Sequence, residues 1–215
     1  MRAVTPLSRV LAERCTDCGD SAGVAFMTGL LTGEGTRDDY IALVAQHYFI
    51  YEALEAVTES MAARPEAAPF ITPHLTRLPA ITEDLRFLIG DDWCERIAPL
   101  PSTAAYVDRI RSVAGEWTGG FIAHHYTRYL GDLSGGRFIR SLLQRRFGFD
   151  TNGVGFYLFD QIAEPRAFKS TYREQLDAVD WTDAERERVI DEVSVAYRLS
   201  TSVLSSLAEA KLQAA

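Results

Sequence analysis

The chain has 215 residues, of which 47% are hydrophobic and 24% are charged, as in an ordinary globular protein. The net charge of -8 argues against nucleic-acid binding through overall charge, and no apolar run reaches the ~18 residues of a transmembrane helix. Three cysteines are too few for a disulfide framework, and the first 15 residues lack the apolar segment of a signal peptide. We therefore expect a reduced, cytoplasmic protein without nucleic-acid or membrane partners.

Helical periodicity dominates the first third of the chain. Pro6 suits the first turn of a short helix over 6–15, and a second short helix is expected over 22–31. Within 37–62, apolar residues recur at steps of three and four, which predicts a long helix with one buried face and Thr36 as its N-cap. This apolar stripe consists of Tyr40, Leu43, Val44, His47, Tyr51, Leu54, Val57 and Met61.

Helical patterns continue to the end of the chain. The proline-rich stretch 64–79 is expected to be a loop that holds at most a short turn. Thr182 and Glu185 form a capping-box pattern at the start of the last helix. Further helices are expected over 82–90, 102–114, 120–146 and 164–178. No βαβ rhythm or internal repeat occurs, so the predicted fold is all-α, a single domain over 1–215 with about eight helices around one core.

Three glycines interrupt the helix expected over 120–146. Gly131, Gly135 and Gly136 each cost about 1 kcal/mol relative to alanine in a helix interior. Gly131 and Gly135 share one face, which something can approach closely, and Gly136 could kink the helix. Two interpretations are open: close packing of another helix, or a flat ligand that lies against the backbone. Arg128 and Asp132 border the glycine face and favour the second interpretation.

The same segment is locally basic in an acidic protein. Residues 128–146 contain five arginines and one aspartate, a local charge of +4. Most of these arginines are expected to form a solvated helix face, but the cluster also suits an anionic ligand or partner.

The stretch HHYTRYLGDLSGG closely resembles the distal-helix signature of heme oxygenases. Further motifs follow the order and spacing of that family: FMTGLL (26–31), IYEALEAV (50–57), AAYVDRI (104–110), GFYLFDQI (155–162) and FKSTYREQL (168–176). The resemblance covers Phe26 to about residue 178. It implies a heme-oxygenase-like fold in which heme b, as substrate or cofactor, lies between a proximal N-terminal helix and the kinked glycine-rich helix.

The resemblance also implies roles for particular residues. Asp132 would anchor a water network near the heme iron, joined by Arg128, Tyr51 and Tyr106, and this network would control proton delivery. The backbone at Gly131, Gly135 and Gly136 would admit the porphyrin. Contacts to the heme propionates would come from Tyr126, Lys169 and Arg173, and cationic donors suit carboxylates.

One position departs from the family pattern. The family's iron ligand is a histidine about eight residues before the Phe-Met motif, and that position holds Cys18 here. No histidine occurs in residues 1–46, and Leu11 replaces a lysine that often contacts a propionate. Cys18 could be an inert buried thiol in a decayed site, a thiolate ligand of iron, or half of a redox or metal pair with Cys15. We expect Cys18 to be the iron ligand. The adjacent His124 and His125 point to different helix faces and are expected to pack and hydrogen-bond.

Three functions are therefore open. The first is oxidative heme degradation to biliverdin, carbon monoxide and iron, with O₂ and electrons from a reductase or ferredoxin that docks near Arg140, Arg145 and Arg146. The second is a heme-thiolate protein that keeps its heme as cofactor for another oxidation, because thiolate favours O–O cleavage. The third is a heme sensor or carrier. We expect the first, in a monomer or weak dimer.

Overall fold

The structure, a computed structural model, describes residues 5–14 and 21–214, and within these ranges it contains helices and no β-strand. The α-helices are α1 (Leu7–Arg14), α2 (Ser21–Thr32), α3 (Arg37–Met61), α4 (Leu78–Ile89), α5 (Trp93–Arg96), α6 (Pro101–Arg109), α7 (Thr118–His125), α8 (Gly131–Phe147), α9 (Pro165–Ala178) and α10 (Asp183–Ala214). The prediction of an all-α fold is confirmed. None of the described helices is both long and apolar enough to cross a membrane.

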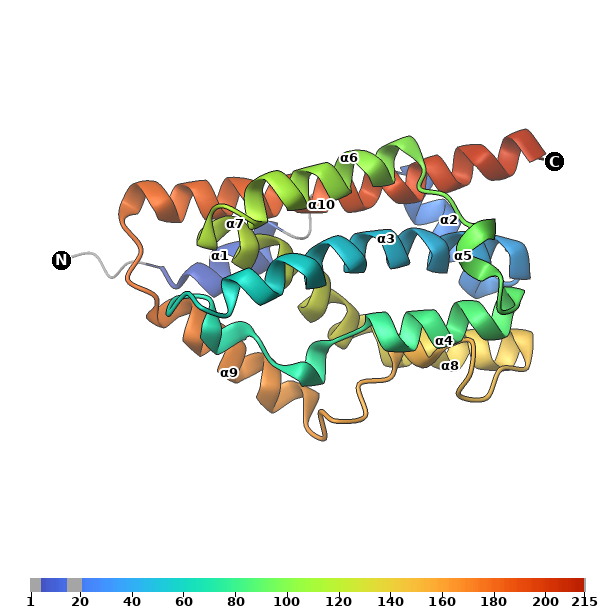
Figure 1. Cartoon of the computed structure of the whole chain (residues 1–215), viewed down its shortest axis with the longest axis horizontal. Helices are drawn as coiled ribbons and strands as arrows, with labels where there is room; N and C mark the ends of the chain where they lie inside the picture. Colours follow the sequence, from blue (N-terminus) through green and yellow to red (C-terminus); the bar gives the residue numbers. More distant parts are fainter. Residues whose placement is uncertain (1–4, 15–20, 215) are drawn as a thin grey trace.

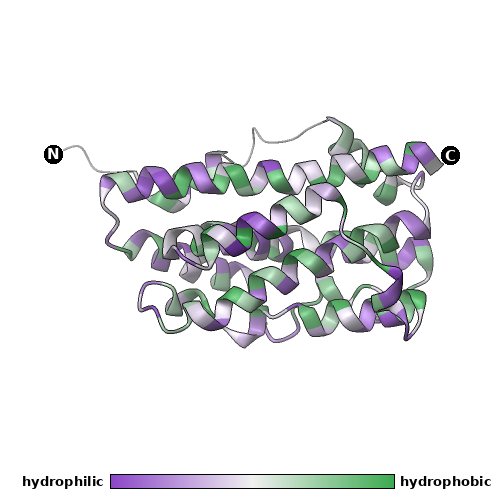
Figure 2. Ribbon diagram, turned by 45° about the horizontal axis from the view of Figure 1, so that its top comes forward, coloured by the Kyte–Doolittle hydropathy of each residue, from purple (hydrophilic) through white to green (hydrophobic). Residues whose placement is uncertain are grey.

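Helix α3 runs through the middle of the protein, with α6 and α10 on one side and α4 and α8 on the other (Figure 1). Thr36 begins α3 with a complete capping box, in which its hydroxyl accepts from the Asp39 amide at 3.1 Å. Most of the predicted stripe is buried in the core, whereas His47 and Val57 are half-buried. On α10, hydrophobic and hydrophilic residues alternate along the ribbon, as expected of a helix with one face on the core (Figure 2).

The stretch expected to be a loop over 64–79 is more ordered than its prolines suggest. It contains two 3-10 turns, Ala68–Phe70 and Pro73–Leu75, and α4 then begins at Leu78, four residues earlier than expected. The early start has a tertiary cause. The Glu55 carboxylate on α3 accepts hydrogen bonds from the backbone amides of Arg77 (2.5 Å) and Leu78 (3.2 Å), which satisfies donors that the first turn leaves free.

The helix expected over 120–146 exists but its irregular turn lies elsewhere. Between α7 and α8 the chain winds through a π-helical turn, Tyr126–Leu130, so the widened turn precedes Gly131. Gly136 itself lies inside α8, within Gly131–Phe147. A second π-helical turn, Ile110–Ala114, extends α6. Gly148, with φ of 71°, ends α8 in the left-handed conformation that favours glycine.

Glu192 joins α10 to α6 and α7. Its buried carboxylate accepts hydrogen bonds from Arg109 Nε at 2.9 Å and from Arg109 Nη2 at 2.5 Å. His124 Nε2 lies 3.0 Å from the same carboxylate. Burial alone would raise the pKa of Glu192, but the hydrogen bonds with His124 and Arg109 hold it at about 2. The ionised carboxylate is therefore a fixed link between three helices.

We predict that Glu192→Gln lowers the free energy of unfolding by about 2 kcal/mol at neutral pH, since charged hydrogen bonds are replaced by neutral ones. Because the folded-state pKa of Glu192 lies at about 2, below the ordinary value of 4.5, its stabilisation is present above pH 4.5 and is lost as the pH falls toward 2. Urea unfolding at several pH values should therefore show a difference that narrows below pH 4.5.

Asp191→Asn, at an exposed carboxylate on the same helix, is the matched control and should change stability little at any pH. A loss of stability in Glu192→Gln that stays constant from neutral to acidic pH would contradict the proposed link.

Candidate functional site

Three of the predicted site residues meet where the π-helical turn joins α8. The hydroxyl of Tyr51, on α3, donates a hydrogen bond to Asp132 Oδ2. Arg128 Nη2 lies 3.6 Å from the same oxygen, an ion pair longer than a hydrogen bond. The Arg128 guanidinium also lies 5.1 Å from the centre of the Tyr51 ring. A carboxylate, a cation and a phenol therefore lie next to one another in this site.

The electrostatics of this group follow from its burial. Burial raises the pKa of the Asp132 carboxyl, while Arg128 and the Tyr51 hydrogen bond oppose the rise. Burial and the Asp132 charge raise the pKa of Tyr51 well above its ordinary value, so Tyr51 is a neutral donor. Burial would lower the pKa of Arg128, but Asp132, Tyr51 and Tyr106 together outweigh it and raise the pKa, so the guanidinium stays charged. The group can therefore hold a fixed positive charge beside a carboxylate that can exchange a proton.

Tyr106, the fourth residue expected in this group, lies on α6 beside His124 of α7. It is fully buried on α6, and its ring packs against His124 with centroids 5.6 Å apart. Its hydroxyl neighbours that of Ser200 on α10. Burial raises the pKa of Tyr106, so it too is neutral.

The three glycines have different surroundings. A Cβ added at Gly131 would meet nothing within 4 Å, and one at Gly135 would meet only Ile139 Cδ1 at 3.8 Å. A Cβ at Gly136 would lie 3.3 Å from Tyr157 Cδ1. Gly131 and Gly135 therefore expose open backbone, as the interpretation of a flat ligand requires, whereas Gly136 allows close packing of Tyr157.

A cavity of about 160 Å³ opens beside Asp132 between α2, α3, α8 and α10. We call it the polar cavity because charged and polar groups lie among its apolar walls. Its lining comprises Met27, Leu43, His47, Ile50, Arg128, Asp132, Ile139, Tyr157, Ser200, Val203 and Leu204.

A basic cluster lies at the exposed end of the site, where α9 passes α8. Lys169 Nζ donates a hydrogen bond to Ser134 Oγ at 3.0 Å. Partial burial and then the charges of Arg173 and Arg166 lower the pKa of Lys169, which places these three cations near one another. Tyr126 is buried nearby, its ring 6.3 Å from that of Tyr172 on α9. Crowded cations of this kind suit a ligand with carboxylates.

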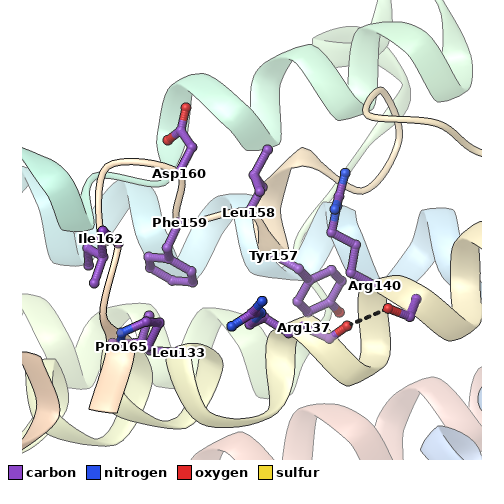
Figure 3. Close-up of a pocket in the computed structure, with 11 residues that line it drawn as sticks. Leu133, Arg137, Arg140, Tyr157, Leu158, Phe159, Asp160, Ile162 and Pro165 are labelled. Carbon is purple, nitrogen blue, oxygen red and sulfur yellow. Dashed lines mark hydrogen bonds between the residues drawn. The ribbon is translucent and has the colours of Figure 1, made fainter. Parts of the chain in front are cut away.

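A second cavity, of about 360 Å³, lies between α8 and the segment 157–165 (Figure 3). Arg137 lies between the rings of Phe159 and Tyr157 in this view. Tyr157 lines both this cavity and the polar cavity. None of the site residues expected from the sequence lines the second cavity, so it is a neighbour of the site and not part of it.

Several neighbours of the site carry no sequence signal that distinguishes them from packing residues. His47, one turn before Tyr51, was part of the apolar stripe, yet it lines the polar cavity. Tyr157 belongs to the GFYLFDQI motif, and nothing in the sequence marks it as a residue of the cavity wall. His124 and His125 pack and hydrogen-bond as expected, to Glu192 and to the Tyr172 hydroxyl (2.9 Å). Cys15 and Cys18 lie outside the described residues.

The arginines of α8 divide into two groups. Arg146 donates hydrogen bonds to the carbonyls of Gly33 (2.7 Å) and Gly35, so it holds the connection between α2 and α3. Arg145 is exposed. Arg145 therefore belongs to the expected solvated face, whereas Arg146 does not.

Comparisons with known proteins agree on one family. The family model described as heme oxygenase matches residues 6–206. A heme oxygenase from Pyropia yezoensis is 34% identical over 212 residues, 98% of this chain and 89% of that protein. Heme oxygenase 1 from Homo sapiens is 36% identical over 207 residues, 94% of this chain and 72% of that protein. The crystal structure of heme oxygenase-1 from the cyanobacterium Synechocystis in complex with heme has a TM-score of 0.90 at 30% identity, and it covers 98% of this chain and 96% of that one.

Because the three glycines have different surroundings, we predict that replacing each by alanine changes the free energy of unfolding differently. Gly131→Ala and Gly135→Ala should each raise the free energy of unfolding of the ligand-free protein by about 0.5–1 kcal/mol, because alanine is the better helix former and the added methyl meets open space. Gly136→Ala should gain less or lose stability, because Tyr157 must shift. Thermal unfolding of the three variants checks this. Equal destabilisation by Gly131→Ala and Gly136→Ala would show that both glycines are packed.

Proposed function

The chain belongs to the heme oxygenase family, and we propose that it binds heme on the Gly131 and Gly135 face of α8 and degrades it to biliverdin, carbon monoxide and iron. The observation that carries the proposal is the open backbone at Gly131. An alanine there would cost nothing in packing, so the structure gives no reason for glycine other than access by a flat ligand.

The residues around this face fit heme. A porphyrin needs an apolar surface for its ring and cations for its two carboxylates. The open face at Gly131 and Gly135 lets the ring approach α8 closely, and Lys169 and Arg173 supply the cations. Tyr126 would add a hydrogen bond from the turn before α8. These are the propionate contacts that we propose.

Heme supplies the redox chemistry, because its iron binds and activates O₂ with electrons from a partner. The protein must supply protons at one place. Asp132 is suited to this, since burial raises its pKa and the Tyr51 hydroxyl fixes the orientation of Oδ2. Arg128 holds the carboxylate by charge, and we propose that it and Tyr106 complete the hydrogen-bonding network around Asp132.

On the opposite side of the heme we propose that Cys18 ligates iron as thiolate. Its place in the chain is that of the family's histidine ligand, and residues 1–46 contain no histidine. Iron would deprotonate the thiol on binding. The same position favours a second candidate function, a heme-thiolate protein that retains its heme for another oxidation or for heme sensing or transport, because thiolate ligation favours O–O cleavage over attack on the porphyrin.

We propose further that residues 1–215 form one domain, supported by a single core cluster with members on α1, α3 and α10. A cytoplasmic location would keep the Cys18 thiol reduced. The electron donor would be a reductase or ferredoxin that docks on the basic face of α8, where Arg145 is exposed and Arg140 is partly exposed, while Arg146 is engaged within the protein. We propose a monomer or weak dimer.

The proposed activity predicts a stepwise result with purified protein. Hemin titration should give a saturable Soret band near one equivalent, and a reductase, its electron source and O₂ should then replace that band with the absorption of biliverdin. Asp132→Asn keeps the shape of the side chain but cannot hold the proton, so it should retain heme binding and lose most of the product. A Soret band that persists in the wild-type protein would favour the retained-heme function, and failure to saturate with hemin would contradict both.

The proposed iron ligand predicts a spectroscopic change. The ferrous carbon monoxide complex should absorb at the red-shifted position typical of thiolate-ligated heme, because sulfur donates electron density to iron. Cys18→Ala should abolish this feature, and the matched variant Cys15→Ala should leave it. Ferric and ferrous spectra that are unchanged in Cys18→Ala would contradict thiolate ligation by this residue.

A further inference from the structure

Asp177 lies where a carboxylate does not favour its own helix. It is the penultimate residue of α9, which ends at Ala178, and the last turn of α9 contains no basic residue. The free carbonyls of a last turn carry partial negative charge, so a carboxylate there weakens the helix. Where a residue breaks such a local preference, an interaction with another part of the structure is the explanation to look for.

The partner of Asp177 is Ser8, in the first turn of α1. Asp177 Oδ1 accepts a hydrogen bond from the Ser8 amide at 2.8 Å, and Oδ2 accepts one from the Ser8 hydroxyl at 2.6 Å. The amides of a first turn have no acceptor within their own helix, and the first turn of α1 holds no acidic residue of its own. A negative charge is favourable at this end of a helix. Asp177 therefore caps α1 from a position 169 residues further along the chain.

Helix α1 needs such support because it is short. It has 8 residues, and isolated helices of fewer than about 12 residues are marginal in water. Leu7 and Leu11 are buried in the core, and Arg186 of α10 donates a hydrogen bond to the carbonyl of Thr5. The helix lies between α9 and α10 and contacts both (Figure 1). The position of α1 is therefore set by α9 and α10.

Nearer its start, α9 contacts α8. Lys169 Nζ donates its hydrogen bond to Ser134 Oγ of α8 at 3.0 Å. Lys169, Arg173 and Asp177 follow one another at steps of four residues, so they lie along one side of α9. The step from Lys169 to Asp177 spans about 12 Å at the rise of an α-helix. One helix therefore carries the proposed propionate cations and, about two turns further on, the cap of α1.

The spacing along α9 matters for heme because a porphyrin is rigid. The ring fixes how far the iron lies from the edge that bears the carboxylates. The iron ligand and the propionate cations must therefore be held at a matching separation. The proposed ligand, Cys18, follows shortly after α1 in the chain. An anchor between α1 and α9 is thus an anchor between the two ends of the proposed heme site.

We propose that Asp177 is a positioning residue for heme, which acts through Ser8 and α1 to hold the iron-ligating segment at a set separation from the cations of α9. This inference rests on the proposed heme site, with iron bound by the segment after α1. It does not require that the heme be degraded, and it does not depend on the chemistry of the ligand atom.

The first test measures backbone amide hydrogen exchange in the ligand-free protein. In Asp177→Ala the amides of α1, such as that of Leu11, should exchange about tenfold faster, because hydrogen bonds to a charged acceptor are lost. Asp177→Asn keeps an acceptor oxygen for the Ser8 amide and should show a smaller change. Asp180→Ala, at an exposed carboxylate just after α9, is the matched control and should behave as the wild type.

The second test uses the full chain loaded with hemin. Titration gives the dissociation constant, and electron paramagnetic resonance of the ferric complex reports the geometry of the axial ligand. Asp177→Ala should raise the dissociation constant about tenfold and shift or broaden the resonances, because the ligating segment no longer keeps one position. Asp177→Asn should restore the wild-type spectrum. Ser8→Ala, which loses only the hydroxyl bond, should change both readouts in the same direction by less.

The outcomes separate a positioning role from a structural one. Faster exchange in α1 of Asp177→Ala, with an unchanged hemin affinity and spectrum, would show a cap alone and overturn the positioning role. Unchanged exchange in α1 would overturn the cap as well. If the wild-type protein bound hemin without forming biliverdin, the proposed degradation would fail and the positioning role would stand. If it bound no hemin, both would fail. Should Asp177→Ala not fold, Ser8→Ala provides the same comparison.

Discussion

Arg128 and Asp132 bring opposite charges to within 3.6 Å of each other in the interior of a helical protein, where an unpaired charge is costly. The remaining structure around the site accommodates this pair. Tyr51 projects from α3 to donate to the carboxylate, and the π-helical turn Tyr126–Leu130 places Arg128 on the turn before α8. Because the pair is held from two helices, its geometry depends on how α3 packs against the α7–α8 segment. A change in how α3 packs against the α7–α8 segment would therefore also change the geometry of the charged pair.

On the glycine face of α8, open space is gained at the expense of helix stability. Gly131 and Gly135 weaken α8 as a helix, and no neighbouring group occupies the space that their missing side chains leave, apart from Ile139 near Gly135. The loss is tolerated because α8 is supported elsewhere: Gly136 packs on Tyr157, and Arg146 ties the far end to the carbonyls of Gly33 and Gly35. A ligand that covers the open backbone would recover stability through binding, since it favours the folded state alone.

Sequence periodicity was sufficient for the fold class, for α3 with its Thr36 cap, and for α9, because these features depend on local spacing and capping. It failed at α4, whose start depends on Glu55, more than twenty residues away in the chain. Periodicity also gave no sign of the π-helical turn Tyr126–Leu130, because a glycine is visible in a sequence whereas a π-helical turn is not. The pairing of Tyr51, Arg128 and Asp132 came from the family resemblance. His47 was assigned to the core because its periodicity is that of an apolar residue, and the space beside it depends on four helices at once.

We propose that heme lies on the open face of α8, between the charged group at Asp132 and the cations of α9. A crystal structure of the protein with heme bound would locate it. We expect the porphyrin in van der Waals contact with the backbone of Gly131 and Gly135, and its carboxylates beside Lys169 and Arg173. Heme bound instead in the cavity beside Arg137 and Phe159, with the glycine face left uncovered, would contradict it.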